Sequence, residues 1–421
     1  MRVLLLSTTT GYQLRSFDDA ARRLGIELIF ATDRCHELED PWRDRAIPIR
    51  FHRPDESLEA IASHARQAPL EGILSVGDRP VLLAARAAER LGLPGHPPHA
   101  AAASSNKRET RARFARAGLH APWNHTVPLG ANPGAAAADP RLRFPCVLKP
   151  LGLSGSRGVI RADSPAQFVE AFERIARLLR RLDVRAARTG LEDDVLVEGF
   201  VPGHEFAIDG VMTAGALQPF AIFDKPDPLN GPFFEETIYV TPSTLGGLTQ
   251  VHLLAIVETA AKALGLWHGP IHAECRIGPD GVVPLEIAAR PIGGLCSKAL
   301  RFEGGASLEE VLLRHAIGQD VSRYARESAA SAVMMIPIPK RGMLKRVEGE
   351  EGARRVPGIE DIRISAKIDQ LLEPLPEAGS YLGFIFARAP SAREAEALVR
   401  EAHAQLRFVI DPEIPVISAV G

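Results

Sequence analysis

Gly269-Pro-Ile-His-Ala-Glu-Cys-Arg-Ile-Gly-Pro-Asp-Gly-Val-Val-Pro-Leu-Glu-Ile-Ala-Ala-Arg290 has the pattern of a β-hairpin with acidic side chains on one face. Apolar residues occupy every second position on both sides of Gly278–Gly281, which indicates two half-buried strands. A Pro-Asp-Gly loop suits a type I turn closed by a left-handed glycine. In that register Gly278 pairs with Val282, and Glu274 faces Glu286.

These two glutamates are expected to share a cation. Directly opposed side chains are roughly 5 Å apart at Cβ, and like charges there are destabilising. Two carboxylates together with phosphate oxygens are common ligands of Mg²⁺ in nucleotide enzymes. The alternative is an exposed hairpin whose acids face water. We therefore predict a metal site at Glu274 and Glu286.

A second segment has the composition of a phosphate-binding loop. Lys149 ends a predicted strand and leads into Leu151-Gly-Leu-Ser-Gly-Ser-Arg-Gly158. Glycines let backbone amides approach an anion closely, and Lys149 adds positive charge. The segment lacks the Walker pattern and leads into a strand, so an ordinary flexible turn is the alternative. Lys107 upstream and the two glutamates downstream favour the phosphate interpretation.

Composition excludes several classes of protein. The chain has 421 residues, a net charge of −2, 46% hydrophobic and 24% charged residues, which favours a soluble protein of two to four domains. A nearly neutral chain does not favour binding of nucleic acid or of an anionic membrane. The cysteines are scattered and no apolar run reaches about 18 residues, so we expect no disulfide framework, no membrane span and a cytoplasmic location.

The order of predicted elements suggests an α/β and α+β multidomain protein. Residues 1–98 have a βαβ opening, but the turn Ser7-Thr-Thr-Thr-Gly11 lacks the dinucleotide fingerprint, which disfavours a dehydrogenase. The loop-rich tract 127–140 precedes the phosphate segment, and the last part alternates strands with a helix over 392–406. We expect four parts: 1–98, 99–190, 191–325 and an α+β module over 326–421.

Taken together, these residues resemble the ATP-grasp superfamily of carboxylate–amine ligases in kind and order. The resemblance covers most of the chain and implies a Rossmann-like N-terminal domain followed by an ATP-grasp fold. Gly342–Val347 and Gly379–Arg388 resemble the C-terminal part of L-amino-acid ligases, which form dipeptides. The residues that match are Lys107, Lys149, the segment Val197–Phe206 with its Gly-x-Glu, Glu274, Glu286 and Arg290.

The resemblance implies a role for each of these positions. ATP and two Mg²⁺ ions, which Mn²⁺ could replace, are the implied cofactors. Ligases of this kind are often homodimers. The implied roles are phosphate contact for Lys107 and Lys149; loop closure for Ser154, Gly155 and Ser156; adenine recognition for Glu198 and the backbone of Phe200 and Val201; ribose binding for Glu205; metal ligation for Glu274 and Glu286; and stabilisation of the acyl phosphate for Arg290.

One position departs from the common pattern. Many relatives have Glu-x-Asn on the second strand, whereas this chain has Glu286-Ile-Ala288. Ala288 cannot bind a metal, which leaves open how a second ion would be held. Amino-acid ligases resemble this chain in having Glu-x-Ala-Ala-Arg, so the departure favours that subgroup.

The substrates are less well defined by the sequence. We expect a carboxylate and an amine, both amino acids; a bicarbonate-using carboxylase and a non-catalytic nucleotide-binding regulator are the alternatives. Each pocket candidate also has a structural alternative, namely a buried hydrogen-bonded histidine, a turn or core packing. The candidates are His272 for substrate or phosphate, Glu235 or Glu236 for an ammonium group, Trp267 and His268 in the same cavity, and Gly293 and Gly294 beside Arg290.

Overall fold

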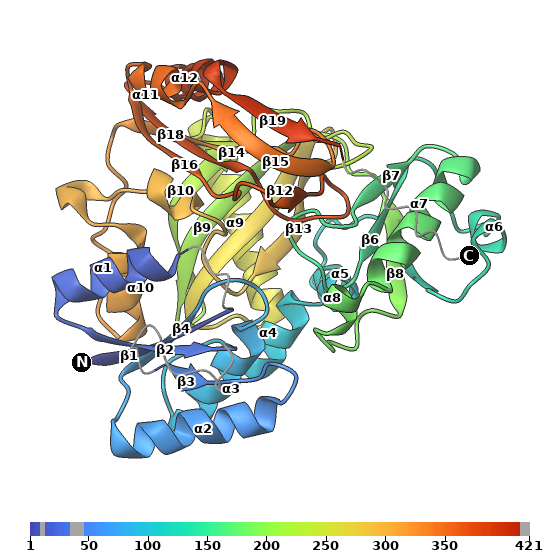
Figure 1. The fold of residues 1–421 in the computed structure, drawn as a ribbon. Coiled ribbons are helices and arrows are strands. Elements are labelled where there is room, and N and C mark those ends of the chain that lie inside the picture. Colours follow the sequence, from blue (N-terminus) through green and yellow to red (C-terminus); the bar gives the residue numbers. More distant parts are fainter. Residues whose placement is uncertain (9–12, 34–45, 413–421) are drawn as a thin grey trace, which may run out of the picture.

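The computed structural model describes residues 1–8, 13–33 and 46–412. Cys35 and most of the turn Ser7–Gly11 lie outside the described residues. Within those ranges the chain forms a mixed α/β fold with four sheets (Figure 1). None of the helices in these ranges combines the length and apolar character needed to cross a membrane.

The N-terminal part is a small parallel sheet in the order β3-β2-β1-β4. The core of this sheet is apolar because Val3–Leu6 are fully buried. Its strands are β1 (Arg2–Ser7), β2 (Glu27–Thr32), β3 (Ile47–Pro48) and β4 (Gly72–Ser75), and its helices are α1 (Leu14–Leu24), α2 (Pro54–Gln67) and α3 (Val81–Leu91). The carboxyl end of β4 leads to Gly77 and Asp78, at the edge of a parallel sheet where ligands commonly bind.

The second sheet is antiparallel and contains the glycine-rich segment. Its order is β5-β8-β6-β7, and the segment Leu151–Gly158 connects β6 to β7. Apolar residues of α7 (Pro165–Leu179) pack on this sheet. The strands are β5 (Asn124–Pro128), β6 (Cys146–Pro150), β7 (Ile160–Ala162) and β8 (Asp194–Gly199), with short helices α4 (Pro98–Ser104), α5 (Lys107–Arg116), α6 (Pro133–Ala137) and α8 (Leu182–Arg185) nearby in the chain.

A long sheet forms the centre of the molecule (Figure 1). Apolar residues of α9 (Gly247–Leu264) cover one face, while His272, Glu274 and Arg276 lie on the other. Its order is β13-β12-β9-β10-β11-β14-β18-β16, namely β13 (Gly281–Ala288), β12 (Gly269–Gly278), β9 (His204–Thr213), β10 (Ala216–Asp224), β11 (Ile238–Thr241), β14 (Ala330–Ile336), β18 (Gly383–Ala389) and β16 (Ile359–Ile364).

The C-terminal part both extends this sheet and adds one of its own. Strands β14, β16 and β18 complete the long sheet, and β17-β15-β19 form a separate three-stranded sheet. The predicted boundary at 325/326 therefore lies between strands of one sheet, and that at 190/191 precedes β8, which pairs with β5 and β6. The further elements are α10 (Leu308–Ala316), β15 (Gly342–Glu348), α11 (Glu350–Arg355), β17 (Leu371–Leu372), α12 (Ala392–Gln405) and β19 (Arg407–Asp411).

The hairpin β12–β13 contains the predicted pair Glu274–Glu286, but the residues nearer the turn pair in a different register. Glu274 pairs with Glu286, and His272 pairs with Ala288. Near the turn, however, Gly278 pairs with Gly281 rather than with Val282. A β-bulge leaves Leu285 between the pairs Cys275–Pro284 and Glu274–Glu286 and restores the predicted register.

Because of the changed register, the side chains of β13 do not alternate between the two faces as predicted. Val283 and Leu285 were expected on the core face with Ile287. Instead, Val282 packs in the core with Ile287, and Leu285 lines the large cavity. Its carbonyl accepts a hydrogen bond from Arg111 Nη1 at 2.6 Å. Pro284 has no N–H to donate to the ladder, which is a physical reason for an irregularity at this point.

Candidate active site

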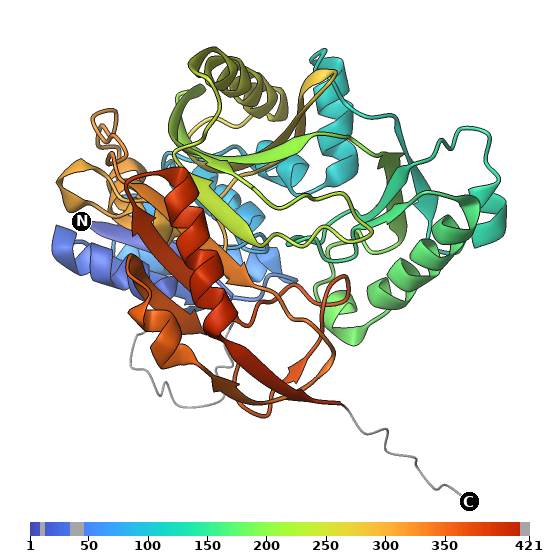
Figure 2. The ribbon, with the colours of Figure 1, turned by 90° about the horizontal axis from the view of Figure 1, so that it is seen from above.

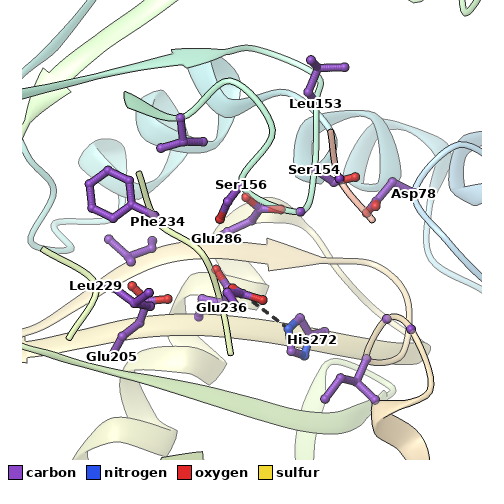
Figure 3. A pocket seen from close by; sticks show the side chains of 18 of the residues that line it. Asp78, Leu153, Ser154, Ser156, Glu205, Leu229, Phe234, Glu236, His272 and Glu286 are labelled. Atoms are coloured by element: carbon purple, nitrogen blue, oxygen red, sulfur yellow. Dashed lines mark ion pairs between the residues drawn. The ribbon is translucent and has the colours of Figure 1, made fainter. Parts of the chain in front are cut away.

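All four sheets or their connections border one cavity of about 480 Å³. In Figure 3, Ser154 and Ser156 of the glycine-rich loop lie opposite Glu236 and His272. Asp78 from the N-terminal part lies beside Ser154. Residues from distant parts of the sequence therefore meet around a single space.

The floor of the cavity contains a cluster of carboxylates. Glu205, Glu236 and Glu274 each have an oxygen within 4.8 Å of the oxygens of the other two, a spacing that could hold a metal ion. Glu286 lies beside this cluster, opposite Glu274. The predicted pair of acids thus forms part of a larger acidic group.

Lys225 lies at the centre of that acidic group. Its Nζ is 2.8 Å from Glu205, 2.7 Å from Glu236 and 3.0 Å from Glu274. Burial alone would lower the pKa of Lys225, but the three carboxylates outweigh burial and raise it well above its usual value. The ammonium group therefore stays charged and balances part of the buried negative charge.

The carboxylates respond differently to this environment. Burial raises the pKa of Glu236 to about 7, and the nearby Glu274 adds to the effect. Burial would also raise the pKa of Glu274, but Lys225 and His272 outweigh it and hold that pKa well below its usual value. Tyr239 donates a hydrogen bond to the second oxygen of Glu236 at 2.8 Å.

The glycine-rich loop is tied to the hairpin through Lys107. Lys107 begins α5, which Asn106 caps by accepting hydrogen bonds from Arg108 N and Glu109 N. Lys107 Nζ donates to the Leu153 carbonyl at 2.7 Å and lies 3.4 Å from Glu286. The lysine thus joins the predicted phosphate-binding loop to a predicted metal ligand.

Lys149 and Glu198 form a buried ion pair at the base of the loop. Lys149 Nζ is 2.5 Å from Glu198, and Arg111 binds both oxygens of the same carboxylate. Burial would raise the pKa of Glu198, yet the two cations lower it to about 2. Burial lowers the pKa of Lys149, and Glu198 opposes that change. Glu198 therefore holds Lys149 in place, and its implied adenine contact stays a prediction.

The segment after Glu198 forms a hinge beside an apolar slot. Phe200 N–H donates to the Pro145 carbonyl at 3.1 Å, and the Val201 carbonyl accepts from Arg276 at 2.7 Å. An adenine contact through this hinge would therefore use the Phe200 carbonyl and the Val201 N–H. Apolar side chains that pack together around the slot come from Val147, Val159, Phe200, Leu229 and Phe234.

Glu205 lines the cavity next to this slot. Its second oxygen accepts a hydrogen bond from Arg276 at 2.9 Å, while Lys225 binds the first. A ribose hydroxyl could reach this carboxylate only as an additional partner. Its place between slot and acidic cluster fits the implied role in nucleotide binding.

The other end of the cavity contains Arg290. Its Nε is 2.7 Å from Asp78, which comes from the N-terminal part. Burial would lower the pKa of Arg290, but Asp78 outweighs burial and raises it, so the guanidinium stays charged. An anionic group that enters this end would meet Arg290, while Asp78 keeps the guanidinium in place.

His272 is held by a buried acid. Its Nδ1 is 3.0 Å from Asp209, whose other oxygen accepts the Ile292 N–H at 3.0 Å. Burial would lower the pKa of His272, but Asp209 and Glu274 raise it to about 9. A histidine that remains protonated near neutral pH is suited to attract anions rather than to accept a proton.

The structure brings most predicted site residues into this cavity. Glu236, Gly293 and Gly294 line it together with the implied nucleotide, metal and catalytic positions. Trp267 and His268 are not among its lining residues, so the expectation that they share this cavity is wrong. Glu235 does not line it either, which leaves Glu236 of the two acids. Trp267 is 54% exposed, and His268 stacks on His315 at a ring distance of 4.1 Å in a separate small pocket.

Sequence reasoning missed Asp78, Arg111 and Lys225 as members of the site. Asp78 follows a buried strand and a glycine, a position that could have identified it as a residue at a sheet edge. Arg111 has no local signal because its partner Glu198 is distant in sequence. Lys225 directly follows β10, and two of its acidic partners, Glu205 and Glu274, are distant in sequence.

Three families of protein domain match the chain. They are the ATP-grasp N-terminal domain over residues 17–95, the ATP-grasp domain over 142–299 and the L-amino acid ligase C-terminal domain 2 over 334–411. The matches follow the same order as the parts described above. They include the glycine-rich loop and the hairpin within the ATP-grasp domain.

Individual curated proteins also resemble this chain in sequence. An uncharacterized protein of Sinorhizobium fredii is 23% identical over 98% of this chain and 84% of its own length. The alanine–anticapsin ligase of Bacillus subtilis is 28% identical over 62% of this chain, and the match spans 56% of that ligase. The chain therefore aligns with little more than half of that relative.

A solved structure resembles nearly the whole chain. The L-amino acid ligase from Bacillus licheniformis superposes with a TM-score of 0.82 and 24% identity, over 97% of this chain and 98% of the other. This likeness supports the fold. The three matched domains identify the chain as an ATP-grasp protein with a C-terminal domain of the L-amino acid ligase kind.

Proposed function

We propose that the protein is an ATP-dependent ligase that joins the carboxylate of one amino acid to the amine of another. A carboxylate is a poor acyl donor because its oxygen is a poor leaving group. Transfer of the γ-phosphoryl group of ATP gives an acyl phosphate, which an amine attacks with loss of phosphate. The products are an amide, ADP and inorganic phosphate.

The nucleotide is expected to lie between the apolar slot and the glycine-rich loop. Adenine fits the slot beside Phe200 and Phe234, and the ribose would lie near Glu205. The phosphates would then extend towards Lys107 and Lys149, under the backbone of Ser154–Ser156. Phosphoryl transfer depends mainly on such positioning and on neutralising charge.

The acidic cluster fits a divalent cation. Glu274 and Glu286 face each other, and the buried Lys225 ammonium shows that their surroundings already stabilise positive charge. Carboxylate oxygens with phosphate oxygens suit Mg²⁺. Glu274 and Glu286 would hold the ion, which would supply positive charge to neutralise the phosphates. Ala288 faces His272 and adds no ligand, so the number of ions stays a prediction.

Arg290 and His272 would act on the acyl phosphate. Both are cationic, and both line the cavity on the side of the hairpin that bears the glutamates. A fixed donor of this kind is often worth about 3 kcal/mol of transition-state stabilisation. Closure of the glycine-rich loop would keep water away from the acyl phosphate.

The amino group of a substrate needs an acidic partner. Of the two predicted acids, Glu236 lines the cavity and has a pKa of about 7, because it is buried beside Glu274. The ammonium group of a substrate would add a second positive charge beside Glu236, which already pairs with Lys225. We therefore assign Glu236 to the ammonium group of a substrate.

The region beyond Arg290 favours an uncharged side chain. Most of its wall is apolar, and glycines beside Arg290 leave room for a substrate. Tyr381 and Phe384 contribute aromatic rings 6.2 Å apart. Other residues at this end of the cavity are Ile292, Gly293, Gly294, Cys296 and Met335.

The convergence of Lys107, Lys149, Glu274, Glu286 and Arg290 on one cavity is the observation that supports this proposal most strongly. The test is phosphate release from Mg·ATP with single amino acids and with pairs, with mass spectrometry of the products and Glu286→Ala as control. Release that needs two amino acids and gives their summed mass minus water would support a dipeptide ligase.

Other results would point elsewhere. Release that depends on bicarbonate would favour the carboxylase alternative, and ATP binding without turnover would favour a regulator. A homodimer and a cytoplasmic location stay predictions, which sedimentation and localisation of the tagged chain can test.

A further inference from the structure

A loop of the C-terminal part lies against the glycine-rich loop. This loop, Glu373–Ser380, follows β17 and is here named the bridge loop. In Figure 2 the orange-red C-terminal part extends towards the green region of α7 and α8. The two loops are far apart in sequence, so their contact joins the C-terminal part to the sheet β5-β8-β6-β7.

Two hydrogen bonds to backbone carbonyls connect the two loops directly. Gly158 N–H donates to the Pro376 carbonyl at 2.8 Å. Arg157 Nε donates to the Glu377 carbonyl at 2.7 Å. Both bonds involve the end of the glycine-rich loop, where it enters β7, so movement of this end away from the hairpin would break them.

Two ion pairs strengthen the same contact. Arg174 of α7 binds Glu377, with Nη2 at 2.8 Å from one carboxylate oxygen. Arg181, just before α8, binds Glu373 at 2.8 Å. The Glu377 and Glu373 side chains are only 29% and 17% exposed, so solvent screens these pairs less than fully exposed ones.

The bridge loop also reaches the cavity itself. Gly379 and the following Tyr381 are among its lining residues. A Cβ at Gly379 would lie 3.8 Å from Arg157 Cβ and 3.9 Å from the Ser154 carbonyl oxygen. The same short segment therefore touches the glycine-rich loop and borders the reaction space.

The opposite side of β7 is held as well. Arg161 N–H donates to the Pro232 carbonyl at 2.9 Å, and Arg161 Nη1 donates to the Asn230 carbonyl at 2.8 Å. These bonds fix the strand but not the preceding turn. The bridge loop supplies the carbonyl partners of Arg157 Nε and Gly158 N–H, next to Ser154–Ser156, and Asp183 binds Arg157 Nη2 at 2.7 Å.

We propose that the bridge loop holds the glycine-rich loop closed over the nucleotide, and that Glu377 is the main positioning residue in it. The inference rests on the proposed ligase function. A closed loop excludes water from the acyl phosphate until the amine attacks it. The C-terminal part thereby determines what fraction of the activated acyl group reaches the amine.

The competing reaction shows what closure prevents. A water oxygen attacks the acyl carbon, the bond from that carbon to the phosphate oxygen breaks, and inorganic phosphate leaves. The carboxylate is regenerated after loss of a proton from the attacking water. The net result is hydrolysis of ATP to ADP and phosphate without formation of an amide. The ratio of phosphate to amide therefore measures how much acyl phosphate is lost to water.

The test combines a structural and a chemical measurement on the full chain. Glu377→Lys places a cation against Arg174 and should speed hydrogen exchange of the Gly158 amide by about two- to fivefold. It should raise the ratio of phosphate to amide by a similar factor. Adding Arg174→Glu restores opposite charges and should bring both values back towards those of the wild type.

Glu351→Lys is the matched control, because Glu351 pairs with Arg355 on the exposed surface of the same part. It should change neither value. If Glu377→Lys does not fold, Arg174→Gln removes the same ion pair from the other side. Unchanged Gly158 exchange together with an unchanged ratio would overturn the proposal.

Failure of the ligase assignment would look different. The wild type would then form no amide with any pair of amino acids, whatever the state of the bridge loop. Gly158 exchange in the presence of Mg·ADP would still decide the structural part of the proposal. Faster exchange in Glu377→Lys would support the closure role, and equal exchange would refute it.

Discussion

The ammonium group of Lys225 lies 3.0 Å from Glu274, the carboxylate that also faces Glu286 across the hairpin. Lys225 is 3% exposed and contacts two further acids, Glu205 and Glu236. A buried cation is thus part of the predicted metal site. It reduces the repulsion among these acids when no other cation is present.

Replacing this lysine should destabilise the protein in a way that Mg²⁺ partly reverses. Lys225→Met leaves one buried and two partly buried acids without their common partner, so the free energy of unfolding should fall by about 3–5 kcal/mol. Excess Mg²⁺ should raise the Tm of the variant more than that of the wild type. Thermal unfolding with and without Mg²⁺ measures both effects.

Lys262→Met is the control for Lys225→Met, because Lys262 forms an exposed pair with Glu258 on α9. It should leave Tm and its response to Mg²⁺ unchanged. An equal response to Mg²⁺ in Lys225→Met and in the wild type would show that the acidic cluster does not take up a cation.

Glu286 should matter more for activity than for stability. Its carboxylate is 29% exposed, and its ion pair with Lys107 is 3.4 Å long. Glu286→Gln should therefore change the free energy of unfolding by less than about 1 kcal/mol. Loss of a metal ligand should lower the rate of phosphate release by about 100-fold, which corresponds to about 3 kcal/mol.

The comparison variant for Glu286→Gln is Glu348→Gln, at an exposed pair with Arg346. Rates and Tm values of the two variants, measured side by side, separate catalysis from folding. A nearly normal rate in Glu286→Gln would remove this residue from the metal site.

Local patterns explain why the hairpin could be predicted. The strand alternation and the Pro-Asp-Gly turn depend on neighbouring residues, and they placed Glu274 opposite Glu286. The bulge at Leu285 could not be predicted, because it depends on Arg111, which donates to the Leu285 carbonyl from another helix. Two deviations of one residue, at the turn and at the bulge, cancel in the final register.

Most of the contacts that could not be predicted join residues that are far apart in the sequence. Glu198 was expected at the adenine edge, but its contact with Arg111 joins positions 87 residues apart. Lys225 reaches Glu274 over 49 residues, and Asp78 reaches Arg290 over 212. Strand β14 (Ala330–Ile336) is wholly buried and apolar except for Ser331, and such a run does not by itself distinguish a strand from a helix.

Arg111 should be among the most important residues for stability outside the reaction itself. It is 1% exposed, binds both oxygens of Glu198, and donates to the Leu285 carbonyl at the bulge. Arg111→Met should lower the free energy of unfolding by about 3–5 kcal/mol, since Glu198 would keep only Lys149 as a partner. Urea unfolding measures this change.

Arg116→Met provides the control for Arg111→Met on the same helix, where Arg116 pairs with Glu109 on the surface. Its free energy of unfolding should differ from that of the wild type by less than about 1 kcal/mol. Equal effects of the two substitutions would show that the buried network around Glu198 contributes no more than a surface pair.

Stability should fall in mild acid because of His96. Its Nε2 lies 3.1 Å from the Pro270 carbonyl, and its Nδ1 accepts the Trp267 N–H at 3.1 Å. A neutral ring satisfies both contacts, whereas a proton on Nδ1 would remove the second. Burial accordingly lowers the pKa of His96 to about 4.

The direction of the pH effect follows from this lowered pKa. In the unfolded chain His96 binds a proton below about pH 6.5. In the folded chain it binds that proton only below about pH 4. The free energy of unfolding should therefore decrease between pH 7 and pH 5, by about 2 kcal/mol from this histidine. Urea unfolding at several pH values gives the slope, and His96→Gln should make it smaller whatever its effect at pH 7. The same slope in both proteins would mean that His96 titrates alike in the folded and unfolded chain.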